Sequence, residues 1–262
     1  MSGLAMVTGA SSGIGAAYAE RLAGDGWNLM LTARNTERLE ERAARLRSTH
    51  SVDVEVATAD LSDIDQIEAL CAQLESRQVD MLVNNAGVAE YMPFEELPVQ
   101  TLMGLITLDV LAPVRLTRAV LPGMLSRRGG AVITIASLLA FSGKWPATHL
   151  PARAAYASSK AFLVTFGELL SAEVSERGVH VQVCCPGVVR TEFHERQGMD
   201  LSATPRMEAE DVVTASLADL AAGALVSVPG LEDRTALQRL DDALSAFMRV
   251  SRVTELPARY RG

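Results

Sequence analysis

The chain has 262 residues, and its 24 lysines and arginines against 32 aspartates and glutamates give a formal net charge of −8. Because it lacks a basic excess that could displace the counterions of phosphates, we do not expect it to bind nucleic acid. A chain of this length buries about 75% of its unfolded surface and needs no metal or disulfide staple. Its three cysteines, two of them adjacent, form no disulfide framework.

Neither a membrane span nor a signal peptide is expected. The longest apolar stretch, residues 131–141, is about half of the roughly 20 residues that a spanning helix needs. No basic region precedes the first apolar run, as a signal peptide would require. The odd number of cysteines is typical of a reducing compartment. These features favour a cytoplasmic protein that does not bind membranes.

Apolar runs alternate with helical stretches along most of the chain. In chain order we expect strand 4–8, helix 13–25, strand 27–33, helix 36–48, strand 52–57, helix 63–78, strand 80–84, helix 112–127, strand 131–136, helix 155–176, and strands 179–184 and 224–228. Strands that read as unbroken apolar runs between helices are typical of a parallel sheet covered on both faces. The pattern predicts an α/β fold of Rossmann-like type, with a doubly wound, parallel, seven-stranded sheet in three layers (α/β/α).

We expect a single domain over residues 1–262, because the alternation continues through Val228 without a repeat or a linker. Residues from about 230 to 262 are expected to form a helical tail. Its apolar side chains recur at helical spacing and would bury one stripe: they are Leu237, Leu240, Leu244, Phe247 and Met248.

A glycine-rich turn joins the first strand to the first helix, with the sequence Thr8-Gly-Ala-Ser-Ser-Gly-Ile-Gly15. Gly9 permits a sharp turn because it has no Cβ. Gly13 and Gly15 let the backbone approach a pyrophosphate, which the free N–H groups at the start of the helix would bind. The alternative is a tight turn without a ligand, but the strand–turn–helix context favours a dinucleotide.

The glycine spacing, Thr-Gly-x-x-x-Gly-x-Gly, differs from the G-x-G-x-x-G fingerprint. Three further motifs follow in order: Asn84-Asn85-Ala86-Gly87, then Ser137 with Tyr156-Ala-Ser-Ser-Lys160, then Pro186-Gly187 with Thr191. Over roughly residues 4–230 the chain resembles the short-chain dehydrogenase/reductase family. Each motif is short, but all of them fall near the carboxyl ends of predicted parallel strands, where open α/β sheets bind ligands.

Tyr156 and Lys160 are four residues apart, so on a helix they share one face. A phenol has a reference pKa of about 10, too high for a base near neutral pH. A nearby ammonium group favours the phenolate and lowers this pKa toward the operating range of a general acid–base catalyst. Alone, the spacing would be unremarkable; beside the glycine turn and Ser137 it predicts a catalytic pair.

The resemblance implies an oxidoreductase that transfers a hydride between NADP(H) and a carbonyl or secondary alcohol. Tyr156 would exchange a proton with the substrate oxygen, Ser137 would hydrogen-bond that oxygen, and Lys160 would lower the pKa of Tyr156 and hold the nicotinamide ribose. The residues expected to bind the cofactor are Gly9, Ser11, Ser12, Gly13, Ile14, Gly15, Arg34, Asp60, Leu61, Asn85, Ala86, Gly87, Tyr156, Lys160, Pro186, Gly187, Val189 and Thr191.

Two features depart from the family pattern. Asp109 stands where the family commonly has an asparagine that anchors a proton relay, and an ionised carboxylate cannot donate a hydrogen bond as an amide does. We include Asp109 among the catalytic candidates, with an altered relay or a shifted alignment as the alternatives. Ser137 and Tyr156 are 19 residues apart, longer than usual. The extra segment 141–154, which contains Lys144, Trp145, His149 and Arg153, is a substrate loop, an interface or a surface excursion.

The end of the second strand favours NADP over NAD. An NAD site usually has an acidic residue there to bind the ribose 2′-hydroxyl, whereas this chain has Ala33-Arg34-Asn35. Arg34 would bind a 2′-phosphate through charge-assisted hydrogen bonds; the alternative is a solvated arginine at a helix start. In the family, Asp60 and Leu61 flank the adenine, although Asp60 or Ser62 would also serve to cap the next helix.

The substrate is expected to be a fairly apolar carbonyl or alcohol, bound partly by a loop at about 188–210. The candidate lining residues are Tyr91, Met92, Leu138, Leu139, His149, Val188 and Phe193. No histidine has the spacing of a metal site. The helix after Tyr156 is apolar nearly all round; this indicates a homodimer or homotetramer, or else cover by the chain's own tail.

Two other functions remain open. A nucleotide-binding regulator or scaffold of the same fold would lack turnover, and Asp109 is compatible with it while Ser137, Tyr156 and Lys160 are not. A nucleotide-sugar epimerase or dehydratase is disfavoured by the glycine spacing and by the lack of a sizeable C-terminal substrate domain.

Overall fold

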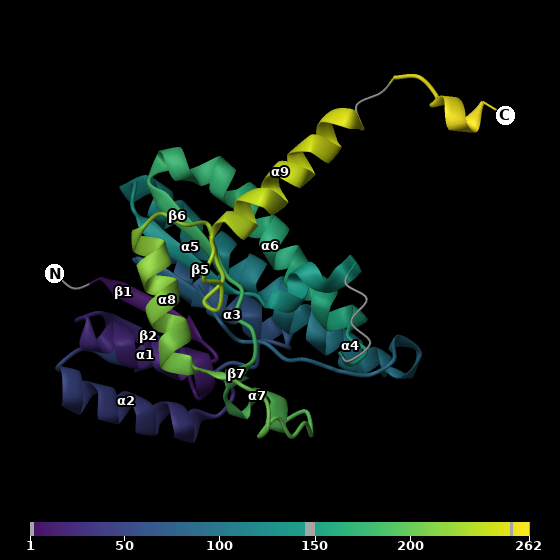
Figure 1. The fold of residues 1–262 in the computed structure, drawn as a ribbon. Coiled ribbons are helices and arrows are strands. Elements are labelled where there is room, and N and C mark those ends of the chain that lie inside the picture. The colour runs from purple at the N-terminus through teal and green to yellow at the C-terminus, as the bar shows by residue number, and fades with distance from the viewer. Residues whose placement is uncertain (1–2, 145–149, 252–253, 262) are drawn as a thin grey trace. The chain divides into compact units, whose positions relative to one another are not determined.

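Seven parallel strands form one sheet in the order β3-β2-β1-β4-β5-β6-β9 (Figure 1). The structure is a computed structural model that describes residues 3–144, 150–251 and 254–261. The strands are β1 (Leu4–Thr8), β2 (Asn28–Thr32), β3 (Val54–Val56), β4 (Met81–Asn84), β5 (Gly130–Ile135), β6 (Val179–Cys184) and β9 (Val226–Ser227). The predicted doubly wound parallel sheet is confirmed. The strand order reverses between β1 and β4, which is where open α/β sheets bind ligands.

Helices cover both faces of this sheet (Figure 1). One face carries α1 (Gly13–Gly24), α2 (Thr36–His50) and α8 (Ala209–Ala221), and the other carries α3 (Ile64–Glu75), α5 (Ala112–Arg127) and α6 (Ala154–Val174). Successive residues of β1 supply both cores, since Ala5 and Val7 pack toward the first set of helices and Met6 toward the second. Both faces of the strands are therefore buried, which explains their unbroken apolar runs.

Several elements were not predicted from the sequence. They are α4 (Val99–Ile106), a π-helical turn at Thr107–Leu111, β7 (Val189–Arg190), α7 (Glu192–Glu195), β8 (Met207–Glu208) and α8. Short 3-10 segments lie at Phe94–Glu96, Leu138–Lys144, Ser175–Arg177 and Ala258–Tyr260. Two-residue strands and a four-residue helix are too short to show a hydrophobic period. Most of these elements lie beyond the carboxyl ends of the strands, around the expected substrate loop.

Among the described residues, one continuous helical run, Val99–Arg127, is long and apolar enough to cross a membrane by length and composition. In the fold its apolar side chains have another partner: Leu116, Val120 and Met124 are buried in the core beneath α5. The run is therefore accounted for as a core helix.

The ends of β1 and β4 are joined by the side chain of Thr8, which is almost completely buried. Its Oγ1 accepts hydrogen bonds from the backbone N–H groups of Asn85 (2.9 Å) and Ala86 (3.0 Å), and it donates one to the carbonyl of Val83. The Asn85 side chain donates to the carbonyl of Thr8 (2.9 Å). This network holds the glycine turn and the Asn-Asn-Ala-Gly segment against each other.

Residues 230–262 form a separate unit. Its main element is α9 (Thr235–Val250), a helix at the predicted place. The prediction that its apolar stripe is buried is wrong for this structure, because Leu240, Leu244, Phe247 and Met248 are exposed.

We expect Thr8→Val to lower the free energy of unfolding by about 2 kcal/mol, because it leaves two N–H groups at this junction without their acceptor. Urea unfolding followed by circular dichroism measures the change. Thr36→Val is the matched control, since its exposed hydroxyl contacts only the exposed hydroxyl of Thr58, and surface changes of this kind stay within about 0.5 kcal/mol. Equal effects of the two substitutions would contradict the role given to Thr8.

Candidate active site

A cleft of about 1100 Å³ lies at the carboxyl edge of the sheet. Its walls come from the segments that follow β1, β2, β3, β4, β5 and β6, from the start of α6 and from the α7 region. Of the site residues expected from the sequence, all but Gly15 and Asp109 line this cleft. Segments far apart in the chain therefore meet in one place, as the topology requires.

The glycine turn has the backbone that a dinucleotide phosphate needs. Gly9 and Gly13 have φ angles of +65° and +55°, in the left-handed region that favours glycine. A Cβ on Gly9 would come within 2.7 Å of the Asn85 side chain, and one on Gly13 within 3.0 Å of Thr191. Ser12 forms no side-chain cap at the start of α1, so the first-turn N–H groups are left to a ligand. The residues present fit a dinucleotide cofactor.

Gly15 packs closely against the turn itself. It does not line the cleft, and a Cβ there would lie 2.4 Å from the carbonyl oxygen of Gly9. The absence of a Cβ at this position is therefore needed for the packing of α1 against the turn.

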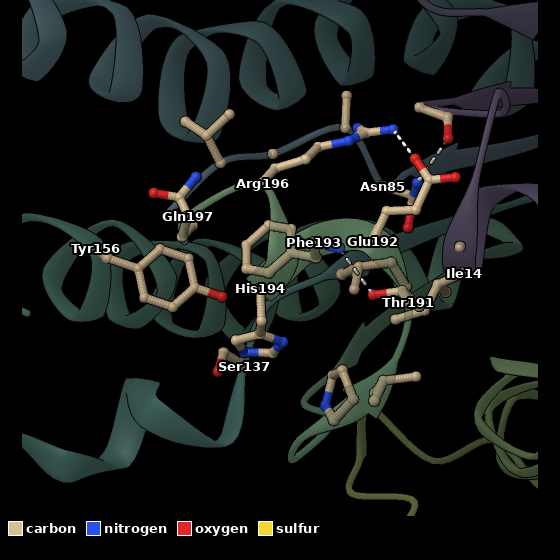
Figure 2. Close-up of a pocket in the computed structure, with 18 of the residues that line it drawn as sticks. Ile14, Asn85, Ser137, Tyr156, Thr191, Glu192, Phe193, His194, Arg196 and Gln197 are labelled. Carbon is tan, nitrogen blue, oxygen red and sulfur yellow. Dashed lines mark hydrogen bonds and ion pairs between the residues drawn. The ribbon is translucent and has the colours of Figure 1, made fainter. Parts of the chain in front are cut away.

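The adenosine end of the cleft is cationic. Arg34 is exposed, lines the cleft and has no hydrogen bond or ion pair with any other residue that the structure describes. The sequence analysis missed Arg38, which also lines the cleft and pairs with Glu192 at 3.1 Å. Glu192 also pairs with Arg196, whose guanidinium contacts Ser12 at 3.2 Å (Figure 2). These side chains connect α2, α7 and the glycine turn around one mouth of the cleft.

Asp60 does not cap α3, and neither does Ser62. The carboxylate of Asp60 accepts hydrogen bonds from the N–H and hydroxyl of Ser62, whereas the cap is Asp63, which accepts from Asp65 and Gln66. Asp60 and Leu61 line the cleft, in keeping with a place beside the adenine.

At the other end, Ser137, Tyr156 and Lys160 come together. Ser137 follows β5, and the two others lie one turn apart on α6, where the Lys160 ammonium is 5.6 Å from the centre of the Tyr156 ring. The ring of Tyr156 is only 5% exposed and packs edge-on against Tyr91 at 5.5 Å. Figure 2 shows its hydroxyl pointing into the cleft toward Ser137 and His194.

Asp109 lies behind this cluster and is completely buried. It sits in the π-helical turn between α4 and α5, a type of distortion frequent at functional sites. Its Oδ2 is 3.1 Å from the Lys160 ammonium, and its Oδ1 accepts a hydrogen bond from the Val88 N–H at 2.9 Å. Ser159 donates to the same carboxylate at 3.4 Å. The alignment that placed Asp109 near the catalytic residues is supported by these contacts.

The expected lowering of the Tyr156 pKa is wrong for this structure. Burial raises the pKa of Tyr156 well above its usual value, the charge of Asp109 raises it further, and a hydrogen bond from Ser137 lowers it. The sequence argument counted the Lys160 charge alone. The structure sets the carboxylate of Asp109 directly against that charge.

The substrate end of the cleft is apolar and aromatic. Tyr91, Leu138, Leu139, Val188 and Phe193 line it as expected. Met92 does not, since it packs with the apolar cluster around Leu97 and Leu105, and His149 lies outside the described residues. In the extra segment, Leu150 and Pro151 line the cleft, and Arg153 donates to the Ser142 hydroxyl.

His194 is a lining residue that the sequence analysis missed. Its ring stacks on Tyr91 with centroids 6.4 Å apart. The Nδ1 atom is buried and has no hydrogen-bond partner among the described residues. Burial and the charge of Arg206 lower the pKa of this histidine, so the ring is neutral near neutral pH. His194 lies three residues after Thr191, within the expected substrate loop at about 188–210, but α7 is too short for the direction of its side chains to be predicted.

Comparison with known proteins gives consistent matches. A family model described as short chain dehydrogenase matches residues 3–201. The chain is 35% identical over 187 residues to a very-long-chain 3-oxoacyl-CoA reductase of Phaeosphaeria nodorum, which covers 68% of this chain and 52% of that protein. The chain thus spans about half the length of this relative. It is 35% identical over 223 residues to sulfoacetaldehyde reductase 2 of Chromohalobacter salexigens, covering 81% of this chain and 86% of the relative.

Among solved structures, a short-chain dehydrogenase from Sphingobium yanoikuyae in complex with NADPH is 34% identical, with a TM-score of 0.93. The match covers 98% of this chain and 100% of that one. The family model, the relatives and the shared fold agree with the motifs at the carboxyl edge of the sheet. The chain belongs to the family of NAD(P)-dependent short-chain dehydrogenases/reductases.

Proposed function

We propose that the protein is an NADP(H)-dependent oxidoreductase that interconverts a carbonyl compound and its secondary alcohol. The observation that carries this proposal is the meeting of the Tyr156 hydroxyl, Ser137 and the Lys160 ammonium at one end of a cleft whose other end is a phosphate-binding glycine turn. Two of the relatives are named as reductases of a carbonyl compound, a 3-oxoacyl-CoA and sulfoacetaldehyde. Their names support reduction of a carbonyl group by this protein.

In the reductive direction, Tyr156 gives its hydroxyl proton to the substrate oxygen as that oxygen gains negative charge. Ser137 donates a hydrogen bond to the same oxygen and stabilises the developing charge. Lys160 holds the ribose hydroxyls of the cofactor and balances charge beside Tyr156. The bound nicotinamide supplies the hydride for the substrate carbon. The buried position of Tyr156 keeps water away from the proton that it transfers.

The cofactor preference rests on the arginines. The glycine turn fits either dinucleotide, but the adenosine end offers Arg34 without a partner and Arg38 close by. Guanidinium groups suit a 2′-phosphate because they form charge-assisted, bidentate hydrogen bonds. The solved relative from Sphingobium yanoikuyae contains NADPH, which supports NADP for this chain as well.

The substrate class follows from the lining of the cleft. The rings of Tyr91 and Phe193 pack against the Tyr156 ring. The ring of His194 and the side chains of Leu138 and Leu139 line the same cleft. Aromatic and apolar walls favour a bulky, uncharged ketone over a small charged aldehyde. The partner expected for this site is therefore an apolar ketone or the corresponding alcohol.

Exposed apolar side chains support a homodimer or homotetramer. On α6, Phe162 stacks on Phe166 at 6.0 Å, and Phe162 and Leu169 are 44% and 62% exposed. On α4, Val99 and Met103 are more than half exposed. Such faces of a parallel α/β fold are typical of interfaces between copies.

A regulator without turnover is the second candidate, and one observation favours it. Asp109 pairs with Lys160 and raises the pKa of Tyr156, which would weaken Tyr156 as a base. A panel of ketones and aldehydes assayed for NADPH oxidation separates the two functions. Tight NADPH binding without turnover of any compound would favour the regulator.

Tyr156→Phe should lower kcat by about 10²- to 10⁴-fold, the usual loss when a general acid is removed. The affinity for NADPH, measured by fluorescence titration, should stay nearly the same because only one hydroxyl is lost. Tyr91→Phe is the matched control: it removes a hydroxyl from the neighbouring ring and should keep most of the activity. Retained turnover in Tyr156→Phe would refute the proposed mechanism.

Arg34→Ala should weaken NADPH binding by about tenfold or more, because hydrogen bonds to charged groups are stronger than neutral ones, and should leave NADH binding almost unchanged. Arg45→Ala on the following helix, α2, is the control, since Arg45 pairs with Glu20 and does not line the cleft. Equal losses for both cofactors in Arg34→Ala would show that Arg34 does not recognise the phosphate.

Sedimentation equilibrium should give a mass that is a multiple of the 28.0 kDa chain. Leu169→Glu places a charge on the exposed face of α6 and should shift the equilibrium toward monomer. A single 28.0 kDa species in the unmodified protein would rule out the proposed oligomer.

A further inference from the structure

Lys160 carries a partner that cancels its charge. The carboxylate of Asp109 approaches the ammonium at 3.1 Å, and both side chains are buried, with 0% and 5% of the Asp109 and Lys160 side chains exposed. The ammonium also donates to the carbonyl of Ile135, at 3.5 Å. Gly87 makes this approach possible, because a Cβ there would lie 3.1 Å from the ammonium and 3.2 Å from Asp109.

The hydrogen bonds of Asp109 suit an ionised carboxylate. Its two oxygens face three donors: the Val88 N–H, the Ser159 hydroxyl and the Lys160 ammonium. Burial raises the pKa of Asp109, while Lys160 and the two other donors oppose that rise. If the shared proton moved from Lys160 to Asp109, the pair would be an amine and a carboxylic acid. Either arrangement has no net charge.

We propose that Asp109, by neutralising Lys160, keeps Tyr156 protonated through neutral pH, so that ketone reduction extends into alkaline pH and alcohol oxidation reaches its full rate only at alkaline pH. This rests on the proposed function. Reduction consumes a proton that the Tyr156 hydroxyl supplies: the hydride forms the new C–H bond, the carbonyl oxygen takes the proton, and solvent returns a proton to the phenolate. Oxidation runs these steps in reverse and needs the phenolate before the hydride leaves the alcohol.

The absence of net charge on the Asp109–Lys160 pair is the reason why Tyr156 stays protonated to higher pH. An uncompensated ammonium beside a phenol stabilises the phenolate and lowers the pKa of the phenol. A pair without net charge gives little such stabilisation, so burial keeps Tyr156 in its neutral form. With a neutral side chain at position 109, the full charge of Lys160 would act on Tyr156. Asp109 touches Lys160 and lies outside the cleft lining, so it is a positioning residue and not a catalytic one.

The other titratable groups around Tyr156 and Lys160 do not change charge in the working range. Burial raises the pKa of Tyr91, from the segment after β4, and of Cys185, after β6, so both stay neutral. His194, from α7, has a lowered pKa and is neutral above its usual range. The charge of Arg153 acts on Tyr91 and opposes the rise of its pKa, and the charge of Glu168 acts on Cys185 and adds to the rise of its pKa. The pH dependence between neutral and alkaline conditions is therefore assigned to Tyr156 and its buried pair.

The test is Asp109→Asn, which keeps the shape and the acceptor for Val88 but leaves the Lys160 charge uncompensated. The pH midpoint at which kcat/KM for alcohol oxidation levels off should fall by about one unit or more, and the midpoint at which kcat/KM for ketone reduction declines should fall by the same amount. Ser159→Ala is the matched control, because it removes a hydrogen bond from the same carboxylate without a change in charge, and it should leave the midpoint in place.

A second measurement does not require turnover. It compares the tyrosinate absorbance of the unmodified protein with that of Tyr156→Phe as the pH is raised. The difference should show that Tyr156 does not ionise below about pH 10, the reference value for a phenol. In the Asp109→Asn background the same difference should show ionisation at lower pH.

Three results would overturn this role of Asp109. They are ionisation of Tyr156 near neutral pH in the unmodified protein, an unchanged midpoint in Asp109→Asn, or equal losses of oxidation and reduction at the same midpoint, which a merely structural role would produce. Failure of the proposed function looks different. In that case Tyr156→Phe keeps its turnover, or no ketone is reduced by the unmodified protein.

Discussion

Seven strands that run in one direction must all end at the same edge of the sheet, and this constraint places every part of the site. Residues as distant as Gly9 and Gly187 line one cleft because each follows a strand. The reversal of strand order between β1 and β4 opens the edge, and Thr8 ties these two strands together where the opening begins. The fold thus supplies a rigid frame in which a glycine turn at one end and a phenol at the other face the same space.

Within this frame, electrostatics divide the cleft into two regions. The adenosine end is exposed and cationic, with Arg34 and the Arg38–Glu192–Arg196 contacts, so it suits the charged half of a dinucleotide. The reacting end is buried, and its one ammonium group is balanced by a carboxylate behind it. A buried ion pair adds little stability by itself, since desolvation costs about as much as the attraction gains. Its importance here is chemical, because it determines the charge that Tyr156 experiences.

The sequence was sufficient to predict the fold and most of the residues that line the cleft, because both depend on patterns along the chain. Apolar runs of strand length predicted the parallel sheet, and the motifs at strand ends predicted which side chains would meet. The contact between Asp109 and Lys160 was not predictable in the same way. It is made through a π-helical turn that carries no sequence signal. Burial is the largest cause that raises the Tyr156 pKa, and the charge of Asp109 raises it further.

Other features have the same origin. The lack of a Cβ at Gly15 serves contact with Gly9. Arg38 and His194 were missed, because one needs the direction of a helix face and the other the direction of the four-residue helix α7. Motif spacing identifies which residues share an edge, whereas side-chain direction depends on packing between elements that the spacing does not describe.

The central claim is that Tyr156 and Ser137 together hold the oxygen that gains or loses the proton. A crystal structure of the protein with NADP and an unreactive alcohol or ketone analogue tests this most directly. The account predicts that the analogue oxygen lies within about 2.5–3.2 Å of both the Tyr156 Oη and the Ser137 Oγ, with the Lys160 ammonium beside the ribose. An oxygen bound elsewhere, or a Tyr156 ring turned away from the cleft, would contradict it.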